Sequence, residues 1–262
     1  MFVAITTYNI FHVSICEDEI GICLRIIVTG KGNAKNLGRM LGYYGMEVKS
    51  LHPIPRLPKR IGKFDISLIM GVKWKSLLKS RFLPGQKVYR FQGSDAYGLM
   101  KKTKTLLKFL KSPILYASEG LKVLVGLYGE VVPTPVDTKI FKPVPGVERT
   151  KDVLYYCPKG KEQIYRRYWI DSYIKEHPNE IVTIIENTNI PHFDMPMIYS
   201  EHKMYIRMTT HDANPKMPYE ALLCGCEVIH NNRRVTNVPR YMLMEETIPK
   251  IIKFFEEIVV KS

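Results

Sequence analysis

Long apolar runs are missing from this sequence of 262 residues. No run approaches the ~18 apolar residues that a membrane-spanning helix needs, so we expect any membrane contact to be peripheral. A secretion signal is not expected either. Residues 1–23 have no basic leader, and Glu17, Asp18 and Glu19 stand where a small-residue cleavage site belongs. We therefore interpret residues 1–23 as an extension before a first strand at Leu24, with an added hairpin, an extra strand and an upstream start as the alternatives.

Cysteine is also scarce. The five cysteines are an odd number and include no Cys-x-x-Cys pair, which argues against a disulfide framework and against a zinc site. Cys224 and Cys226 are close enough to be read as a ligand pair, but their apolar neighbours favour small core residues. Unpaired cysteines are typical of a reducing compartment, so we expect a cytoplasmic protein.

Acidic residues are under-represented in one half of the chain only. The net charge is +14, and residues 1–143 contain 23 Lys+Arg against 9 Asp+Glu, whereas residues 144–262 contain 16 of each. Such asymmetry indicates that the first half meets an anionic partner. A solvated basic surface is the simpler alternative.

Strand and helix patterns alternate through the first half. Leu24–Thr29 has the composition of a buried strand, and the Gly30–Gly32 turn follows it. The other expected strands are 47–51, 64–70, 87–91 and 114–117, and the expected helices are 34–44 and 99–110. This alternation predicts a parallel sheet with helices on both faces.

A proline-rich segment, Val131–Pro145, interrupts the pattern, which then restarts. Strands are expected at 152–157, 181–185, 204–208 and 227–230, and helices at 162–176 and 218–224. Two alternating halves joined by a stiff connector are the plan of the α/β GT-B fold, in which two facing Rossmann-like domains with parallel sheets enclose an interdomain cleft. We expect the domains at residues 1–143, including the extension, and at residues 144–262.

The C-terminal residues carry an apolar stripe at helical spacing, formed by Ile251, Phe254, Phe255, Ile258 and Val259. Core packing is the default interpretation of this stripe. In GT-B proteins the last helix often crosses back to the first domain, and this is the alternative interpretation of the C-terminal helix here.

The most informative stretch is residues 204–229. A strand ends near Arg207, a polar loop carries His211 and Asp212, and a helix is expected to begin at Pro218. Glu220 would then be the third helical residue, with no capping oxygen before it, so we expect its carboxylate to be free to reach forward. The N-terminus of such a helix suits a diphosphate. Taken singly, these side chains are as easily explained as local dipole, ion-pair or loop contacts.

The segment Glu220–Ile229 resembles the second half of the donor-site motif of family 4 retaining glycosyltransferases. Asp212 takes the position of the first glutamate of that motif. Three other segments are similar to parts of the same family: Phe91–Asp95 in the first domain, Val132–Pro143 between the domains, and Val153–Lys161 at the start of the second.

The resemblance implies a role for each matched residue. Glu220 binds the ribose of the nucleotide, Asp212 holds the transferred sugar with His211 nearby, and Arg207 with Lys161 (Lys159 as the alternative) neutralises the diphosphate. The rest of the donor-binding set is Asn214, Lys216, Met217 and Pro218. The acceptor-side set in the first domain is Gly30, Gly32, Gly93, Ser94 and Asp95. A donor such as a UDP- or GDP-sugar is expected, with no metal and no cofactor, and a glycan, lipid-linked or protein acceptor.

Alternatives remain at this point. A basic helix with Lys101, Lys104, Lys108 and Lys111 is similar to those that hold peripheral glycosyltransferases at anionic membranes, although a solvated helix face explains it equally well. A non-catalytic GT-B scaffold and a nucleic-acid-binding protein are the alternative functions, but no nucleic-acid partner is expected because the second half is neutral. A dinucleotide fingerprint fails because Lys35 replaces its third glycine.

Overall fold

The computed structural model describes residues 24–29, 33–51, 65–70, 72, 77–78, 80, 83–92, 101–187, 190–210 and 215–260. Two compact units are formed, one from Met1–Thr134 with Glu245–Ser262 and the other from Pro135–Met244. The sequence predicts the division at residue 143 instead. Val136 and Phe141 lie in the core of the second unit, which explains why it begins within the proline-rich segment.

The first unit is built on a six-stranded sheet of order β2-β1-β3-β4-β5-β6, in which every pair is parallel. Its strands are β1 (Arg25–Thr29), β2 (Glu47–Leu51), β3 (Ile66–Met70), β4 (Gln86–Phe91), β5 (Ile114–Tyr116) and β6 (Glu130–Val131). Its described helices include α1 (Asn33–Gly42), α4 (Lys101–Leu110) and α5 (Glu119–Val125). The central strand β3 is buried along its whole length, as expected for a parallel sheet covered on both faces.

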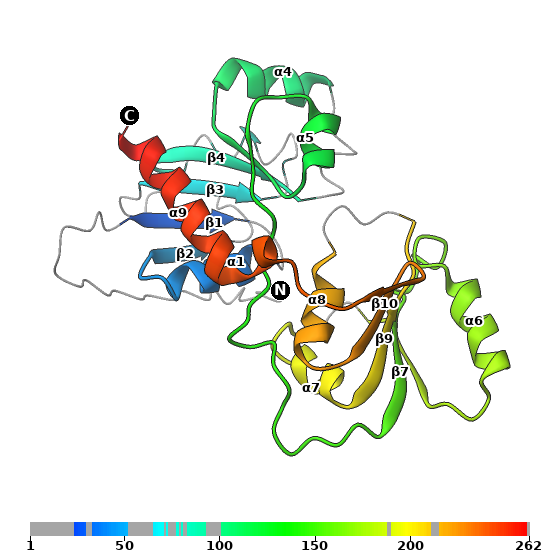
Figure 1. The fold of residues 1–262 in the computed structure, drawn as a ribbon. Coiled ribbons are helices and arrows are strands. Elements are labelled where there is room, and N and C mark those ends of the chain that lie inside the picture. Colours follow the sequence, from blue (N-terminus) through cyan, green and yellow to red (C-terminus); the bar gives the residue numbers. More distant parts are fainter. Residues whose placement is uncertain are drawn as a thin grey trace, which may run out of the picture. The chain divides into compact units, whose positions relative to one another are not determined.

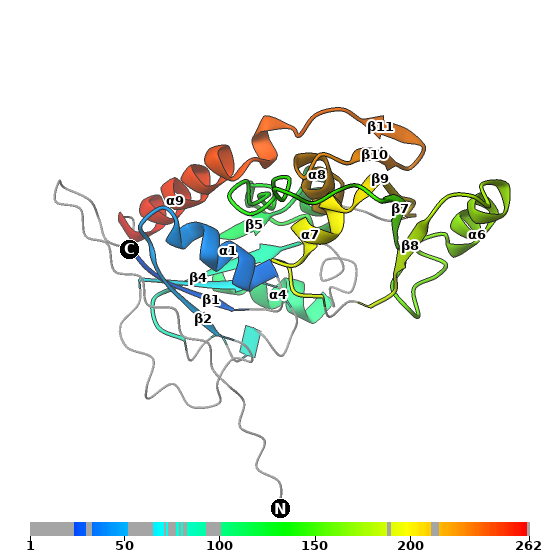
Figure 2. The ribbon, with the colours of Figure 1, turned by 90° about the horizontal axis from the view of Figure 1, so that it is seen from below.

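The last helix, α9 (Met244–Val260), belongs to the first unit from Glu245 onward. It lies beside α1 over the sheet (Figures 1 and 2). Ile251 and Phe255 of the apolar stripe are buried, which follows from their spacing on one face of the helix. None of the helices that the structure describes is long and apolar enough to cross a membrane.

The second unit is built on a five-stranded sheet of order β11-β10-β9-β7-β8. Its strands are β7 (Lys151–Tyr156), β8 (Val182–Ile185), β9 (His202–Arg207), β10 (Glu227–His230) and β11 (Arg233–Val235), and its helices are α6 (Arg167–Glu176), α7 (Met195–Ser200) and α8 (Lys216–Leu223), followed by a 3-10 turn at Arg240–Met242. All neighbouring strands are parallel except the edge strand β11, which pairs antiparallel with β10.

Alternate residues of the central strands point to opposite faces of this sheet and build two cores. Leu154 and Tyr205 pack with α7 and α8, whereas Val153, Tyr155 and Ile206 pack with α6. Figure 1 shows α6 on one side of the strands and α7 with α8 on the other. Cys224 and Cys226 form no disulfide and are buried, so the interpretation of both as core residues is confirmed.

Candidate functional site

The carboxyl ends of β7, β8, β9 and β10 meet at one edge of the second sheet because these strands are parallel. Hydrogen bonds join the segments that follow them. The amide of Cys157 donates to the carbonyl of Ile185 over 3.0 Å, and the amide of Thr209 donates to Asn231 Oδ1 over 2.8 Å. A third bond, 3.0 Å long, joins the Thr210 amide to the carbonyl of Ile164. The loops therefore form one connected rim along this edge.

Arg207 ends β9 and brings a cation to the rim. Its side chain is almost fully buried, and its guanidinium carbon lies 5.3 Å from the ring centre of Tyr156 and 5.1 Å from that of Tyr165. Nη1 is 3.4 Å from Met217 Sδ at the start of α8. Cation–π attraction to two rings and contact with α8 hold the guanidinium in one place. The charge is thus positioned before any ligand arrives.

Helix α8 begins two residues earlier than the sequence predicts. Pro215 precedes it in extended backbone, without a capping side chain, and Lys216 is the first helical residue. Pro218 and Glu220 are therefore the third and fifth helical residues, and the predicted positions one and three are wrong. The physical reason is that the first four amides of a helix have no partner within it, so proline is tolerated throughout the first turn.

Glu220 lies in the centre of a buried polar cluster. Its side chain is 2% exposed, and Oε1 lies 2.9 Å from His192 Nε2 and 3.0 Å from Lys216 Nζ. Lys216 Nζ also lies 2.8 Å from His192 Nε2, so that nitrogen either donates to Glu220 or accepts from Lys216. The expectation that the carboxylate is free is thus wrong for Oε1, because Lys216 sits one helical turn before Glu220 and His192 reaches it from another loop.

The second carboxylate oxygen of Glu220, Oε2, differs from Oε1 in its hydrogen bonds. Among the residues that the structure describes, no hydrogen bond is made to Glu220 Oε2. A carboxylate offers about four acceptor positions, so Glu220 keeps capacity for further donors.

The charged groups in this cluster determine the protonation state of Glu220. Burial alone raises its pKa, but the Lys216 ammonium and the contact with His192 outweigh burial and lower the pKa of Glu220 to about 2. The carboxylate is therefore ionised at neutral pH and balances the charge of Lys216.

His192 is a site residue that the sequence did not indicate. It lies in the loop between β8 and α7, its ring makes an edge contact with Phe141 at 4.8 Å between centres, and its side chain is 20% exposed. Lys216 is 16% exposed. A ligand approaching this corner from solvent therefore meets His192 and Lys216 before Glu220. The only sequence signal was a histidine in a loop after a strand, which is too common to be informative.

Lys159 and Lys161 lie in the turn after β7, at the same edge of the sheet, and both are exposed. Gly160 between them has φ +79°, the left-handed conformation that favours glycine, and its amide donates to Glu162 Oε1 over 2.8 Å. The turn is held through its backbone, which leaves the lysine side chains in solvent.

The structure brings Arg207, Lys216, Met217, Pro218 and Glu220 together around the start of α8 and places Lys159 and Lys161 on the same rim. The other predicted site residues lie outside the described residues: His211, Asp212 and Asn214 in the second unit, and Gly30, Gly32, Gly93, Ser94 and Asp95 in the first.

Comparison with known proteins establishes the fold. No protein-family model and no curated protein sequence matches the chain. Among solved structures it is similar to sucrose-phosphate synthase from Thermosynechococcus elongatus, with a TM-score of 0.51, 13% identity, and coverage of 79% of this chain and 81% of that one. It is also similar to an alpha-glucosyltransferase in complex with UDP and a 13-mer DNA, with a TM-score of 0.53, 11% identity, and coverage of 90% of both chains.

Another alpha-glucosyltransferase structure, in complex with UDP, gives a TM-score of 0.53 and 13% identity over 90% of this chain and 91% of that one. At these identities the likeness concerns the fold. The predicted class, an α/β GT-B fold with parallel sheets, is confirmed.

Proposed function

We propose that this protein is a retaining glycosyltransferase that moves a sugar from a nucleotide diphosphate, UDP or GDP, to a glycan, lipid-linked or protein acceptor. One observation carries the proposal: a fixed guanidinium and a lysine–carboxylate–histidine cluster lie together at the start of α8, on the carboxyl edge of a GT-B sheet. The neighbours include enzymes whose structures contain UDP, and the Glu220 segment resembles the donor motif of family 4.

The chemistry of glycosyl transfer explains the cations. Cleavage of the bond to the sugar puts negative charge on the leaving diphosphate, and preorganised positive charge lowers that barrier. Arg207 is held by two aromatic rings and does not need to reorganise, so we assign it the main share of this stabilisation. Lys161, or Lys159 in its place, is exposed and free to approach the diphosphate from solvent.

Glu220 and its partners would form the nucleotide end of the site. Oε1 is engaged by Lys216 and His192, and we propose that Oε2 accepts a hydrogen bond from a ribose hydroxyl. Ion pairing keeps the carboxylate charged, which makes it a stronger acceptor than a neutral carboxyl. Asp212 and His211 would hold the transferred sugar, as the family resemblance implies. We propose that neither metal nor cofactor takes part.

Two further expectations concern where the protein acts. We propose a cytoplasmic enzyme that is peripheral at an anionic membrane. Lys108 of α4 is exposed, and so is Lys111, which follows the end of the helix, whereas Thr103 and Leu107 face the core. Binding to anionic liposomes that is lost when Lys101, Lys104, Lys108 and Lys111 become glutamine would support membrane attachment; equal binding by both proteins would contradict it.

A nucleic-acid acceptor is a second candidate, because a neighbour of this fold was solved with UDP and DNA together. The first unit has 24 Lys+Arg and 12 Asp+Glu, a net charge of +12, against 15 and 13 in the second unit, a net charge of +2. DNA binding would weaken steeply with salt. Transfer of labelled sugar to DNA, compared with transfer to soluble glycans, separates the two acceptor classes.

The proposal is tested by incubating the protein with UDP-, GDP- and dTDP-sugars and measuring the nucleotide diphosphate released. We expect release from one donor class, with an NMR-detected sugar product of unchanged anomeric configuration. Release with inversion would overturn the retaining mechanism, and no release from any donor, with or without glycan acceptors, would overturn the enzyme assignment.

A further inference from the structure

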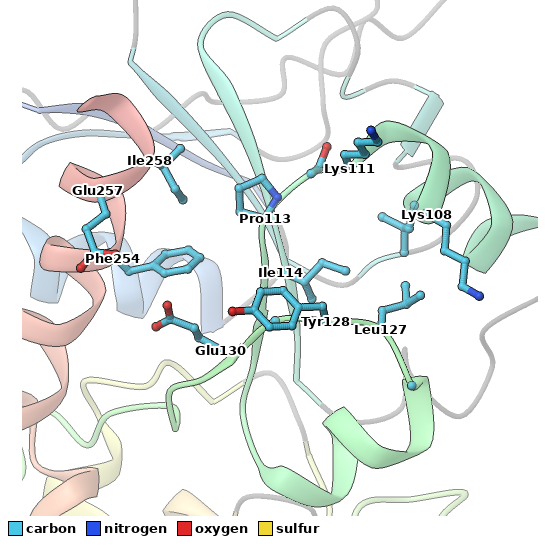
Figure 3. Close-up of a pocket in the computed structure, with 14 residues that line it drawn as sticks. Lys108, Lys111, Pro113, Ile114, Leu127, Tyr128, Glu130, Phe254, Glu257 and Ile258 are labelled. Carbon is cyan, nitrogen blue, oxygen red and sulfur yellow. The ribbon is translucent and has the colours of Figure 1, made fainter. Parts of the chain in front are cut away.

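A cavity of about 610 Å³ opens in the first unit, far in sequence from the residues at the start of α8. It lies where β5 and β6 begin, next to the C-terminal end of α4 and beside α9 (Figure 3). In parallel sheets, ligands of the main site gather at the carboxyl ends of the strands. This cavity lies at the opposite, amino-terminal ends of β5 and β6, and all of its lining residues belong to the first unit, whereas the site described above is built from residues of the second. Its volume is within the range of small-molecule binding sites.

The floor of the cavity is apolar. The side chains that form it come from three separate parts of the chain and include Leu107, Ile114, Leu127, Phe254 and Ile258. Figure 3 shows the ring of Phe254 pointing from α9 toward the ring of Tyr128. Tyr128 is 95% exposed, which is unusual for a large aromatic side chain. The ring of Tyr128 extends the apolar lining of the cavity, and together they offer a ligand one continuous apolar surface.

The loop that carries Tyr128 is held rigidly. The hydroxyl of Tyr116 donates to the carbonyl of Leu127 over 3.1 Å. At Gly129 an added Cβ would lie 2.6 Å from the carbonyl oxygen of Ile114, so the backbone is pressed against β5 and only glycine fits there. Both neighbours of Tyr128 are thus fixed, and the ring is presented without the entropy loss of ordering a mobile loop.

Charges of both signs surround the apolar floor. Lys108 and Lys111 lie at the end of α4, and Glu130 and Glu257 lie on the other side, toward α9 (Figure 3). The two ammonium groups and two carboxylates cancel, so the lining of the cavity has no net charge that would draw a polyanion into it. An acyl chain would form no hydrogen bond with any of these four charged groups. A ligand with apolar faces and many hydroxyl groups fits both features, because hydroxyls donate to carboxylates and accept from ammonium groups.

We propose that this cavity binds a short oligosaccharide, with a sugar ring packed on Tyr128 and its hydroxyls bonded to the flanking lysine and glutamate side chains. This inference rests on the proposed function, because the oligosaccharide that we expect in the cavity is part of the acceptor glycan. Holding part of an acceptor chain at a second site raises its effective concentration near the enzyme.

The test measures binding of maltohexaose, chitohexaose and a hyaluronan hexasaccharide to the full chain by titration calorimetry. We expect at least one of the three to bind, and Tyr128→Ala to weaken binding by about tenfold, the loss expected for an aromatic contact at the centre of a site. Phe109→Ala is the matched control: Phe109 is an exposed aromatic residue of α4, 81% accessible, that does not line the cavity. The Phe109→Ala variant should bind the oligosaccharides as tightly as the wild type does.

Three outcomes would overturn the proposal. One is no binding of any of the three oligosaccharides at about 10 mM. Another is equal weakening by Tyr128→Ala and Phe109→Ala. The third is binding of the anionic probe alone, lost when Lys108 and Lys111 become glutamine but unaffected by Tyr128→Ala, which would indicate an anion or membrane-surface site. Donor hydrolysis measured on the same variants separates this proposal from the enzyme assignment, because Tyr128→Ala should leave hydrolysis without acceptor unchanged.

Discussion

Replacement of Glu220 by glutamine removes one buried charge and almost no volume. The wild-type pKa falls from an ordinary 4.5 to about 2 in the folded protein. One unit of pKa corresponds to about 1.4 kcal/mol, so ionisation of Glu220 stabilises the folded state by about 3 kcal/mol at neutral pH. We expect Glu220→Gln to lower the free energy of unfolding of the second unit by about this amount, because Lys216 then faces a neutral amide.

The sign of the pH dependence follows from the lowered pKa. Stability contributed by a carboxylate of this kind is fully present above its unfolded pKa and is lost as the pH falls through the folded pKa. The difference between wild type and Glu220→Gln should therefore be constant above about pH 5 and shrink from pH 4.5 toward 2.

Urea unfolding followed by the fluorescence of Trp169 provides the assay, because Trp169 stacks between Tyr155 and Tyr173 in the second unit. A Trp74→Phe background removes the other tryptophan of the sequence. Glu227→Gln is the control, since Glu227 pairs with Arg234 at the surface and its loss should change stability by at most about 1 kcal/mol. Equal effects of the two substitutions, or a Glu220→Gln difference that is as large at pH 2.5 as at pH 7, would refute the reasoning.

Three further predictions concern ligand binding and turnover. Arg207→Gln should reduce kcat for nucleotide-sugar cleavage by about 10²–10³, the usual effect of removing one charge-stabilising donor, with a smaller change in KM; an unchanged kcat would exclude Arg207 from the reaction. His192→Ala should raise KM for the donor more than it lowers kcat, because His192 touches Glu220 and not the reacting bond; initial rates at varied donor check this, and a pure kcat effect would contradict it. UDP or GDP should raise the melting temperature, with a stabilisation of about 2.7 kcal/mol at 100 times Kd, whereas NAD should not; the reverse ranking in a thermal-shift series would favour a dehydrogenase.

The regular elements of the fold could be predicted because each has a strong local signal. The segment Leu24–Thr29 contains the apolar run Ile26–Val28 and appears as β1, and the segment Ile181–Ile185 appears as β8 with a difference of one residue. The alternation of such strands with helices was sufficient for the α/β class.

The shortest elements could not be predicted. Strand β11 reads Arg-Arg-Val at an edge of the sheet, where no apolar pattern is required, and α7 has only six residues, too few for a helical period to be recognised. The helix expected from residue 162 begins at Arg167, because Arg166 has φ +44° and the Tyr155 hydroxyl donates to the carbonyl of Tyr165 over 2.6 Å. That bond is a tertiary contact and leaves no local signal.

The candidate site also has one part that the sequence predicts and one part that it does not. Arg207 follows the apolar core of β9 and could be assigned to the sheet edge from the sequence. The burial of Glu220 could not, since its partner His192 is 28 residues away in the chain and lies in a different loop. The sequence indicated a carboxylate free to reach a ligand, and the structure shows that half of that carboxylate already holds the lysine and histidine beside it.

The release of nucleotide diphosphate from sugar donors tests the central claim most directly. Wild-type protein and Arg207→Gln, matched in concentration and shown by circular dichroism to be equally folded, are incubated with UDP- and GDP-sugars in the absence of added metal. The proposed mechanism predicts steady release by the wild type and almost none by the variant. Equal rates, or no release by the wild type from either class of donor, would contradict it.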